Sequence, residues 1–498
     1  MKNLIKFGLF SALAITMVSC GDEFLEKPAL RGSETLTSAQ LLQASEVDPA
    51  VGGALMGGVY SLTFTFNSGG SGGSHTDFGH KSYDVFSDML SSDMALSQSV
   101  YGWYRADITE YQAPLDFTNG ANRQVWRYYY RIVRGCNEVI DGLGGDEFTP
   151  ESAANKAVMG QAKALRAHSY FYLTQFYQKS YDASEPILPL YRNSLEVNGP
   201  KVTAAEIYDL MESDLTDAIA LLEGFSRANK TEINQSVAQG IYAYVLGARG
   251  TDYAKAYDMA KAAIAGGYTV MSSTEITGGF NEVSTPGWMW GVDLNDEIGL
   301  GLVSWWGQMD YFSYSYPAFG DSKSIDQGLF DAIPANDFRK EQFNVNPGSA
   351  THLLPLNKFY DSDRTRYGSS RIVKADYVYM RVAEMHLLAA EYAAFSNNDA
   401  QARTELKALV SQRVPDASYI DGLSGQQLKN EIYLQTRMEL WGEGKSYLAM
   451  KRNKATTVRG SNHLTFVGEP IPYNDERMTF EIPEGEIQFN PFISTQNN

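Results

Sequence analysis

Cysteine is almost absent from this chain of 498 residues, which has only Cys20 and Cys136. At most one disulfide is available, so a chain of this size must be held together by its hydrophobic core. Cys136 lies in VWRYYYRIVRGCNEVI, in step with Val125 and Ile132 on one apolar helical face. We predict that it is a small buried side chain, with a reactive thiol as the less favoured alternative.

Positive charge is also scarce. The chain has 41 Lys and Arg against 59 Asp and Glu, which gives a net charge of −18 at pH 7, and it has no basic run. Binding to nucleic acid depends on neutralising phosphates, so no nucleic-acid partner is expected. Docking on anionic lipid through surface charge is disfavoured for the same reason.

Catalytic motifs are lacking as well. The segment Gly69–Gly73 formally matches G-x-S-x-G, but it lies in a Gly/Ser linker rather than between a strand and a helix. No P-loop lysine follows a glycine-rich stretch. We therefore predict neither an enzyme nor a cofactor, although sequence can neither find nor exclude a glycosidase pair among 59 acids.

Metal ligands are few. Of six histidines, only His75 and His80 lie close together, with Asp77 between them, and no second cluster supplies further ligands. The acidic segments 293–297 (DLNDE) and 361–363 (DSD) carry oxygen ligands of the kind calcium prefers, without EF-hand spacing. Solvated turns are the simpler interpretation, and a structural calcium ion stays open.

Long apolar runs are restricted to the leader, where Phe7–Val18 follows Lys2 and Lys6. The run is shorter than the roughly 20 residues that span a bilayer and is typical of a secretory signal. The following TMVSC resembles the lipobox of bacterial lipoproteins, with Met17 where leucine is usual. This resemblance implies a signal peptide over residues 1–19 and lipid on Cys20. Acidic residues directly after Cys20 resemble the signal for the outer face of the outer membrane.

Helical patterns dominate the rest of the chain. Val237–Val270 gives two apolar helical faces separated by a turn at 249–252, and its 34-residue length is the tetratricopeptide (TPR) period. Such a hairpin cannot bury its own face, so we expect others to stack on it in a right-handed superhelix. Thr203 and Glu206 have the spacing of a capping box. Further helices are predicted in QAKALRAHSYFYLTQFY, TAAEIYDLMESDLTDAIALL, YVYMRVAEMHLLAAEYAAF, DAQARTELKALVSQR and, as one last long helix, QQLKNEIYLQTRMELWGEGKSYLAMKR.

Two regions depart from this pattern. Residues 271–372 are rich in Gly, Pro, Ser and aromatics with short strand-like runs such as IGLGLVSWW, and 464–498 is also non-helical. Irregular insertions on a rigid scaffold often carry function. The predicted organisation is a signal peptide (1–19), an N-terminal region (20–230), a TPR-like hairpin (231–270) and a C-terminal region (271–498) with helices over 373–453.

Several of these segments together resemble the SusD/RagB family of outer-membrane nutrient-binding lipoproteins. The resemblance rests on the lipobox followed by FLEKPAL, on QAKALRAHSYFYLTQFY with a PILPLY exit, on TAAEIYDLMESDLTDAIALL, YVYMRVAEMHLLAAEYA and TRMELWGEGKSYLAMKR, and on EIPEGEIQFNP near the end. It implies a mostly helical protein with a TPR-like scaffold. It also implies non-covalent capture of oligosaccharides or polysaccharides for a SusC-like, TonB-dependent transporter. The stretch YQKSYDASEP departs from the shorter family link.

Aromatic residues gather in the segments that the helical scaffold does not explain. Ser304–Tyr316 contains six aromatic rings in 13 residues, and GWMWGVDL and YGWYRAD add two more clusters. A flat ring complements the C–H face of a sugar, so rings of these segments are the candidate ligand platform. In a strand, Trp305 and Trp306 would point to opposite faces, and one of them would meet solvent. The candidate ligand residues are Tyr101, Trp103, Trp288, Trp290, Trp306, Tyr311 and Tyr314, each with core packing as the alternative.

The favoured prediction is therefore a surface lipoprotein that captures glycans on an aromatic platform. A peptide-binding RagB-like member and a TPR scaffold whose aromatic face binds a protein partner remain alternatives. A lyase or glycosidase is the least favoured class. The charged residues of TRMELWGEGKSY, Arg437, Glu439 and Glu443, are predicted to form a structural ion network rather than a site.

Overall fold

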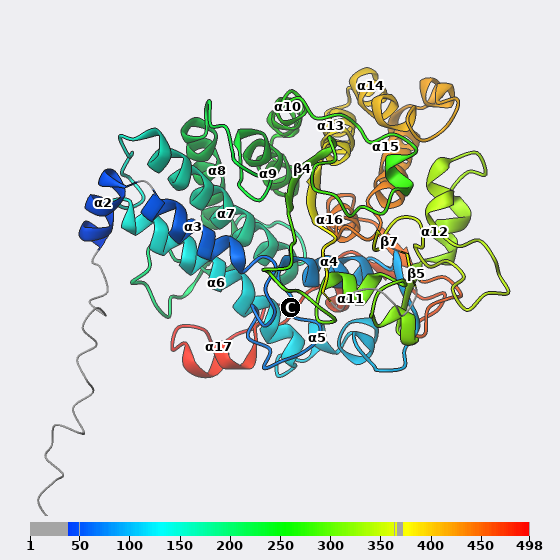
Figure 1. The fold of residues 1–498 in the computed structure, drawn as a ribbon, viewed down its shortest axis with the longest axis horizontal. Helices are drawn as coiled ribbons and strands as arrows, with labels where there is room; N and C mark the ends of the chain where they lie inside the picture. Colours follow the sequence, from blue (N-terminus) through cyan, green and yellow to red (C-terminus); the bar gives the residue numbers. More distant parts are fainter. Residues whose placement is uncertain (1–37, 49, 363, 366–371, 498) are drawn as a thin grey trace, which may run out of the picture.

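The computed structural model describes residues 38–48, 50–362, 364–365 and 372–497 (Figure 1). The predicted signal peptide and Cys20 lie outside the described residues, as does Asp363 of the DSD segment. Within these ranges, every helix is too short or too polar to cross a membrane.

The fold is mostly α-helical, as predicted, and successive helices pack side by side across the molecule (Figure 1). Helix α6 packs on α7, α7 on α8, α8 on α9, α9 on α10 and α10 on α13. Helix α13 packs in turn on α14 and α15. The helices are α2 (Ser38–Val47), α3 (Ala50–Ser61), α4 (His80–Leu90), α5 (Gln112–Leu115), α6 (Gly120–Gly142), α7 (Ala153–Tyr177), α8 (Ala204–Leu221), α9 (Gln235–Arg249), α10 (Tyr253–Ile264), α11 (Trp305–Met309), α12 (Gln327–Ala332), α13 (Val382–Phe395), α14 (Asp399–Val410), α15 (Gly425–Glu439), α16 (Ser446–Arg452) and α17 (Glu484–Phe489).

The hairpin of α9 and α10 shows why small residues recur in this scaffold. A methyl group on Gly247 of α9 would lie 2.1 Å from the Tyr392 hydroxyl of α13, so only glycine allows this crossing. Gly250 ends α9 in the left-handed conformation at φ 69°, and the Asp252 side chain caps α10. The predicted capping box of Thr203 and Glu206 is confirmed at the start of α8.

The prediction of one long last helix is wrong, because the segment forms two helices, α15 and α16, with a non-helical turn between them. Gly442 and Gly444 adopt φ 81° and 76°, which a helix cannot accommodate. A Cβ on Gly442 would lie 2.4 Å from the Phe359 ring, and one on Gly444 would lie 2.2 Å from the Asp84 carboxylate. The backbone N–H of Gly444 also donates to Asp88.

Among the described residues, the strands form four two-stranded antiparallel sheets: β1 (Met94–Gln98) with β5 (Ser322–Ile325), β2 (Pro186–Pro189) with β3 (Lys201–Thr203), β4 (Trp288–Val292) with β6 (Tyr377–Arg381), and β7 (Thr456–Val458) with β8 (Pro470–Pro472). Single helical turns occupy Arg105–Thr109 (π), Glu275–Thr277, Pro317–Phe319, Phe338–Gln342, Ser418–Gly422 and Glu476–Met478 (3-10).

The segment IGLGLVSWW, which the sequence suggested to be strand-like, does not form a strand in the structure. Its first part is irregular, and Trp305 begins α11 because the Ser304 side chain caps that helix. The prediction that 464–498 is non-helical is wrong over Glu484–Phe489, which forms α17 directly after Pro483. The division of the chain at residues 230 and 270 stays a prediction.

A buried ion network ties the C-terminal helices to the irregular segment. Glu439 pairs with Arg381 at 3.0 Å and Arg413 at 2.7 Å, and Glu443 pairs with Arg381 at 2.6 Å and Lys358 at 2.9 Å. Burial raises the pKa of Glu439, but the surrounding guanidinium groups outweigh it and hold that pKa well below its usual range. The predicted structural network is confirmed for both glutamates.

The predictions for Arg437 and for Cys136 also have clear outcomes. Arg437 pairs with Asp93 at 2.5 Å instead of joining Glu439 and Glu443. Cys136 is fully buried on α6, where burial raises the pKa of its thiol, so the buried-residue prediction is confirmed.

Candidate functional site

The pairing of β1 with β5 brings two distant aromatic segments together. Gln98 lies opposite Ser322, so the residues that follow β1 lie beside those that precede β5. The Asp321 carboxylate accepts hydrogen bonds from the backbone N–H groups of Val100 and of Tyr101, the latter at 2.9 Å. These contacts hold the predicted segment YGWYRAD against the end of Ser304–Tyr316.

The result is a surface group of rings that we call the ring cluster, defined as His75, Tyr101, Trp103, Tyr314, Tyr316 and Phe319. Its outer members are exposed: Tyr101 is 56%, Phe319 44% and Tyr314 37% accessible to solvent. The cluster therefore presents aromatic surface to water within a chain that buries most of its large rings.

The ring cluster is packed rather than loosely assembled. His75 stacks on Trp103 with 4.9 Å between ring centroids and 13° between planes. Tyr316 is buried at the centre, edge-on to Tyr101 at 5.5 Å and to Trp103 at 6.0 Å, and its hydroxyl hydrogen-bonds to Nδ1 of His75. Tyr314 packs edge-on against Phe319 at 5.7 Å. Such contacts fix the orientations of the rings.

His75 reaches the cluster through a loop organised by Asp77. The Asp77 carboxylate accepts from the backbone N–H groups of Gly69 at 2.8 Å and Ser71 at 3.1 Å. The His75 carbonyl accepts from the Gln308 side chain at 3.0 Å. Burial lowers the pKa of His75, so the ring is neutral at pH 7.

A buried lysine contacts Gln308, the residue that hydrogen-bonds to the His75 carbonyl. Lys323 of β5 donates to the Gln308 side chain at 2.9 Å and lies over the Tyr104 ring. Burial lowers the pKa of Lys323 to about 7.

Tyr311, another predicted ligand residue, is half-buried and lies beside the cluster rather than within it. Its ring is edge-on to Phe312 at 5.7 Å, and Phe312 in turn contacts Tyr360. The preceding Asp310 accepts from the backbone N–H groups of Phe312 and Ser313, and burial raises its pKa to about 6.

Three predicted ligand residues prove to be core. Trp288, Trp290 and Trp306 are at most 2% exposed, so no sugar ring can lie on them and we remove them from the candidate site. Trp290 donates its indole N–H to the Thr231 carbonyl at 2.9 Å. Trp305 and Trp306 are both buried, contrary to the strand argument, because they lie on a helix and pack edge-on at 5.0 Å.

Three members of the ring cluster, His75, Tyr316 and Phe319, were not predicted as ligand residues. Tyr316 lies in the aromatic stretch 304–316 and Phe319 follows it closely. The density of aromatic residues there was a signal that could have identified both. His75 was considered only with His80 as a metal ligand, but His80 is buried among Tyr129, Tyr172 and Tyr379 instead. Among the described residues, no three His, Cys, Asp or Glu side chains gather as a metal site.

Two family models match separate parts of this chain. A family model described as starch-binding associating with outer membrane matches residues 76–246, and the SusD family model matches residues 339–497. A search of curated proteins gave no match.

Solved structures with the same fold cover most of the chain. A SusD-like carbohydrate-binding protein from Bacteroides vulgatus is 25% identical with a TM-score of 0.75, covering 89% of this chain and 97% of its own. A SusD superfamily protein from Bacteroides thetaiotaomicron is 21% identical with a TM-score of 0.72 (90% and 99% covered). Surface glycan-binding protein A from Bacteroides uniformis is 16% identical with a TM-score of 0.64 (90% and 99% covered). The chain therefore belongs to the SusD/RagB family, among whose models and solved structures are ones described as starch-binding at the outer membrane, carbohydrate-binding or glycan-binding.

Proposed function

We propose that this protein captures oligosaccharides or polysaccharides non-covalently on the ring cluster, without cleaving them. The observation that carries the proposal is the exposure of Tyr101, which packs on the buried Tyr316, and of Tyr314 and Phe319, which pack on each other. Pyranose C–H faces pack on such rings, each well-placed contact contributing on the order of 1 kcal/mol. Neighbouring polar groups, such as the exposed end of Gln98, supply partners for sugar hydroxyls.

A glycan-panel pull-down with the chain lacking residues 1–20 tests this function. The test variant is Tyr101→Ala with Tyr314→Ala, which removes two exposed rings. Because Tyr101 packs edge-on against the buried Tyr316, the folding of this variant is confirmed before binding is measured. The matched control is Phe489→Ala with Phe492→Ala, which removes two rings that are 76% and 62% exposed outside the cluster.

We expect a glycan that binds the parent and the control but not the Tyr101, Tyr314 variant, with no new reducing ends after incubation. Equal binding by all three proteins would remove the ring cluster from the site. A panel in which only peptides bind would favour the RagB-like alternative, and newly released reducing ends would revive an enzyme.

We further propose that lipid on Cys20 anchors the protein to the outer membrane and that a SusC-like transporter receives the captured glycan. The lipobox and the family support this proposal. A Cys20→Ala variant should leave the membrane fraction while keeping its glycan affinity. A variant that stays in the outer membrane would contradict the lipid anchor, and failure to co-purify with the transporter would contradict the partnership.

A further inference from the structure

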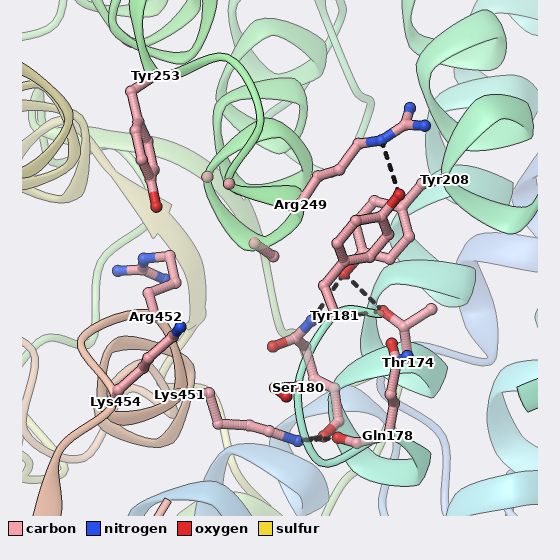
Figure 2. Close-up of a pocket in the computed structure, with 14 residues that line it drawn as sticks. Thr174, Gln178, Ser180, Tyr181, Tyr208, Arg249, Tyr253, Lys451, Arg452 and Lys454 are labelled. Carbon is pink, nitrogen blue, oxygen red and sulfur yellow. Dashed lines mark hydrogen bonds between the residues drawn. The ribbon is translucent and has the colours of Figure 1, made fainter. Parts of the chain in front are cut away.

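A second pocket lies apart from the ring cluster, where the C-terminal ends of α7, α9 and α16 meet (Figure 2). Its volume is about 170 Å³, enough for one small chemical group. Three tyrosines, Tyr181, Tyr208 and Tyr253, contribute to its wall.

Basic side chains line this pocket, in contrast to the acidity of the whole chain. Arg249, Lys451, Arg452 and Lys454 lie in its wall, and no lining residue is acidic, whereas the chain has a net charge of −18. The acids that pair with Arg249 and Arg452 lie outside the lining.

Part of the excess is structural. The last carbonyls of a helix attract cations, and Lys451 donates to the carbonyls of Gln175 and Gln178 at the end of α7. Arg249 pairs with Asp209 at 2.7 Å and with Glu212 at 2.6 Å. These two side chains are satisfied by the protein itself.

Arg452 and Lys454 are not satisfied in this way. The Arg452 side chain is 3% exposed, and its Nε donates to Glu391 at 2.6 Å, but its Nη1 has no hydrogen-bond partner among the described residues. A buried guanidinium N–H without a partner is costly, which points to a missing acceptor. Lys454 is exposed and pairs with no acid in the described part of the chain. Figure 2 shows the Tyr253 hydroxyl pointing toward Arg452.

We infer that this pocket binds a tetrahedral oxyanion, a sulfate or phosphate group either free or as an ester. Its candidate donors lie on three different lining residues: Arg452 Nη1, which is buried without a partner, the Lys454 ammonium and the Tyr253 hydroxyl. Donors on several different side chains suit an anion with three or four acceptor oxygens. A flat carboxylate, in contrast, pairs best with both arms of one guanidinium. The inference does not depend on the ring cluster.

Calorimetric titration of the full-length chain in detergent, at fixed ionic strength, tests the inference. The probes are inorganic sulfate, inorganic phosphate and glucose 6-sulfate. The first variant is Lys454→Asn, since asparagine tolerates the left-handed φ of 50° at this position. The second is Arg452→Lys, which keeps a cation for Glu391 while it removes Nη1. Lys374→Asn, which removes an exposed lysine outside the pocket, is the control.

We expect saturable binding of at least one probe at a single site, unchanged in Lys374→Asn and weakened about five-fold or more in both pocket variants. Tighter binding of glucose 6-sulfate than of inorganic sulfate identifies a sulfated sugar as the source, and equal binding identifies a free anion. No binding of any probe, or equal affinity in all variants, would overturn the inference. Loss of glycan binding to the ring cluster leaves these outcomes unchanged, so the two proposals fail separately.

Discussion

At the scale of single residues, Asp321 holds the segment after β1 in place at the candidate site. One of its carboxylate oxygens accepts from two successive backbone N–H groups, those of Val100 and Tyr101. Asp321→Ala should therefore release this segment and cost about 1–3 kcal/mol of unfolding free energy. Hydrogen exchange should accelerate at the amides of Val100 and Tyr101.

The matched control for this change is Asp116→Ala, which removes an exposed carboxylate that caps Thr118. It should leave exchange at Val100 and Tyr101 unchanged. Unaltered exchange in Asp321→Ala would show that the ring cluster is held by ring packing alone.

Lys323 gives the stability of the protein a pH dependence with a definite sign. Its folded pKa is about 7 against an ordinary value of 10.5, because burial penalises the charged form. Between these values the unfolded chain binds more protons than the folded one, so stability rises with pH, by at most about 1.4 kcal/mol per pH unit for this group. Lys323→Met should show a shallower rise than the parent in urea unfolding at pH 7, 8 and 9. Equal slopes in the two proteins would mean that Lys323 stays protonated in the fold.

At the scale of elements, two glycines decide that α15 and α16 are separate helices. Gly444→Ala should cost about 3 kcal/mol or more, since its positive φ is combined with a 2.5 Å approach to the Asp84 backbone. Gly267→Ala, at φ 88° in open space, should cost only about 1 kcal/mol. Urea unfolding measures both values. Similar losses in the two variants would contradict the role given to close packing.

The sequence predicted the longer helices but not the shortest ones. Periodicity and caps predicted α8, α9 and α10, because these elements are determined by residues a few positions apart. Trp305 and Trp306 could not be assigned in this way. Their helix is five residues long, and both rings are buried. Trp305 packs against partners far along the chain, such as Phe359 and Tyr377, and Trp306 packs against Trp305.

The candidate site was predictable only as a set of aromatic segments. Tyr101, Trp103 and Tyr314 were identified, but Trp288 and Trp290 had the same sequence character and belong to the core. Which ring meets water depends on the pairing of β1 with β5 and of β4 with β6, and no local pattern encodes those pairings.

At the scale of the whole molecule, Glu439 connects parts of the chain that are distant in sequence. It lies within reach of Arg339, Arg381 and Arg413, all of them buried. Glu439→Ala would leave these cations without their shared partner and should cost about 3–5 kcal/mol. Glu138→Ala, which breaks an exposed pair with Arg134, should change stability by less than about 1 kcal/mol. Denaturant unfolding of the two variants measures the contrast, and equal losses would contradict it.

The strand pairing beneath the ring cluster also bears on the order in which the molecule assembles. The hydrogen bond between His75 and Tyr316 joins residues 241 positions apart, and that between Val100 and Asp321 joins residues 221 apart. Helical hairpins close through short loops, whereas contacts of such separation form slowly because a long loop must first be closed. After dilution from denaturant, helical signal should therefore return before ligand affinity does. A newly made chain would thus pass through a stage in which its helical scaffold is complete and its ring cluster has not yet formed.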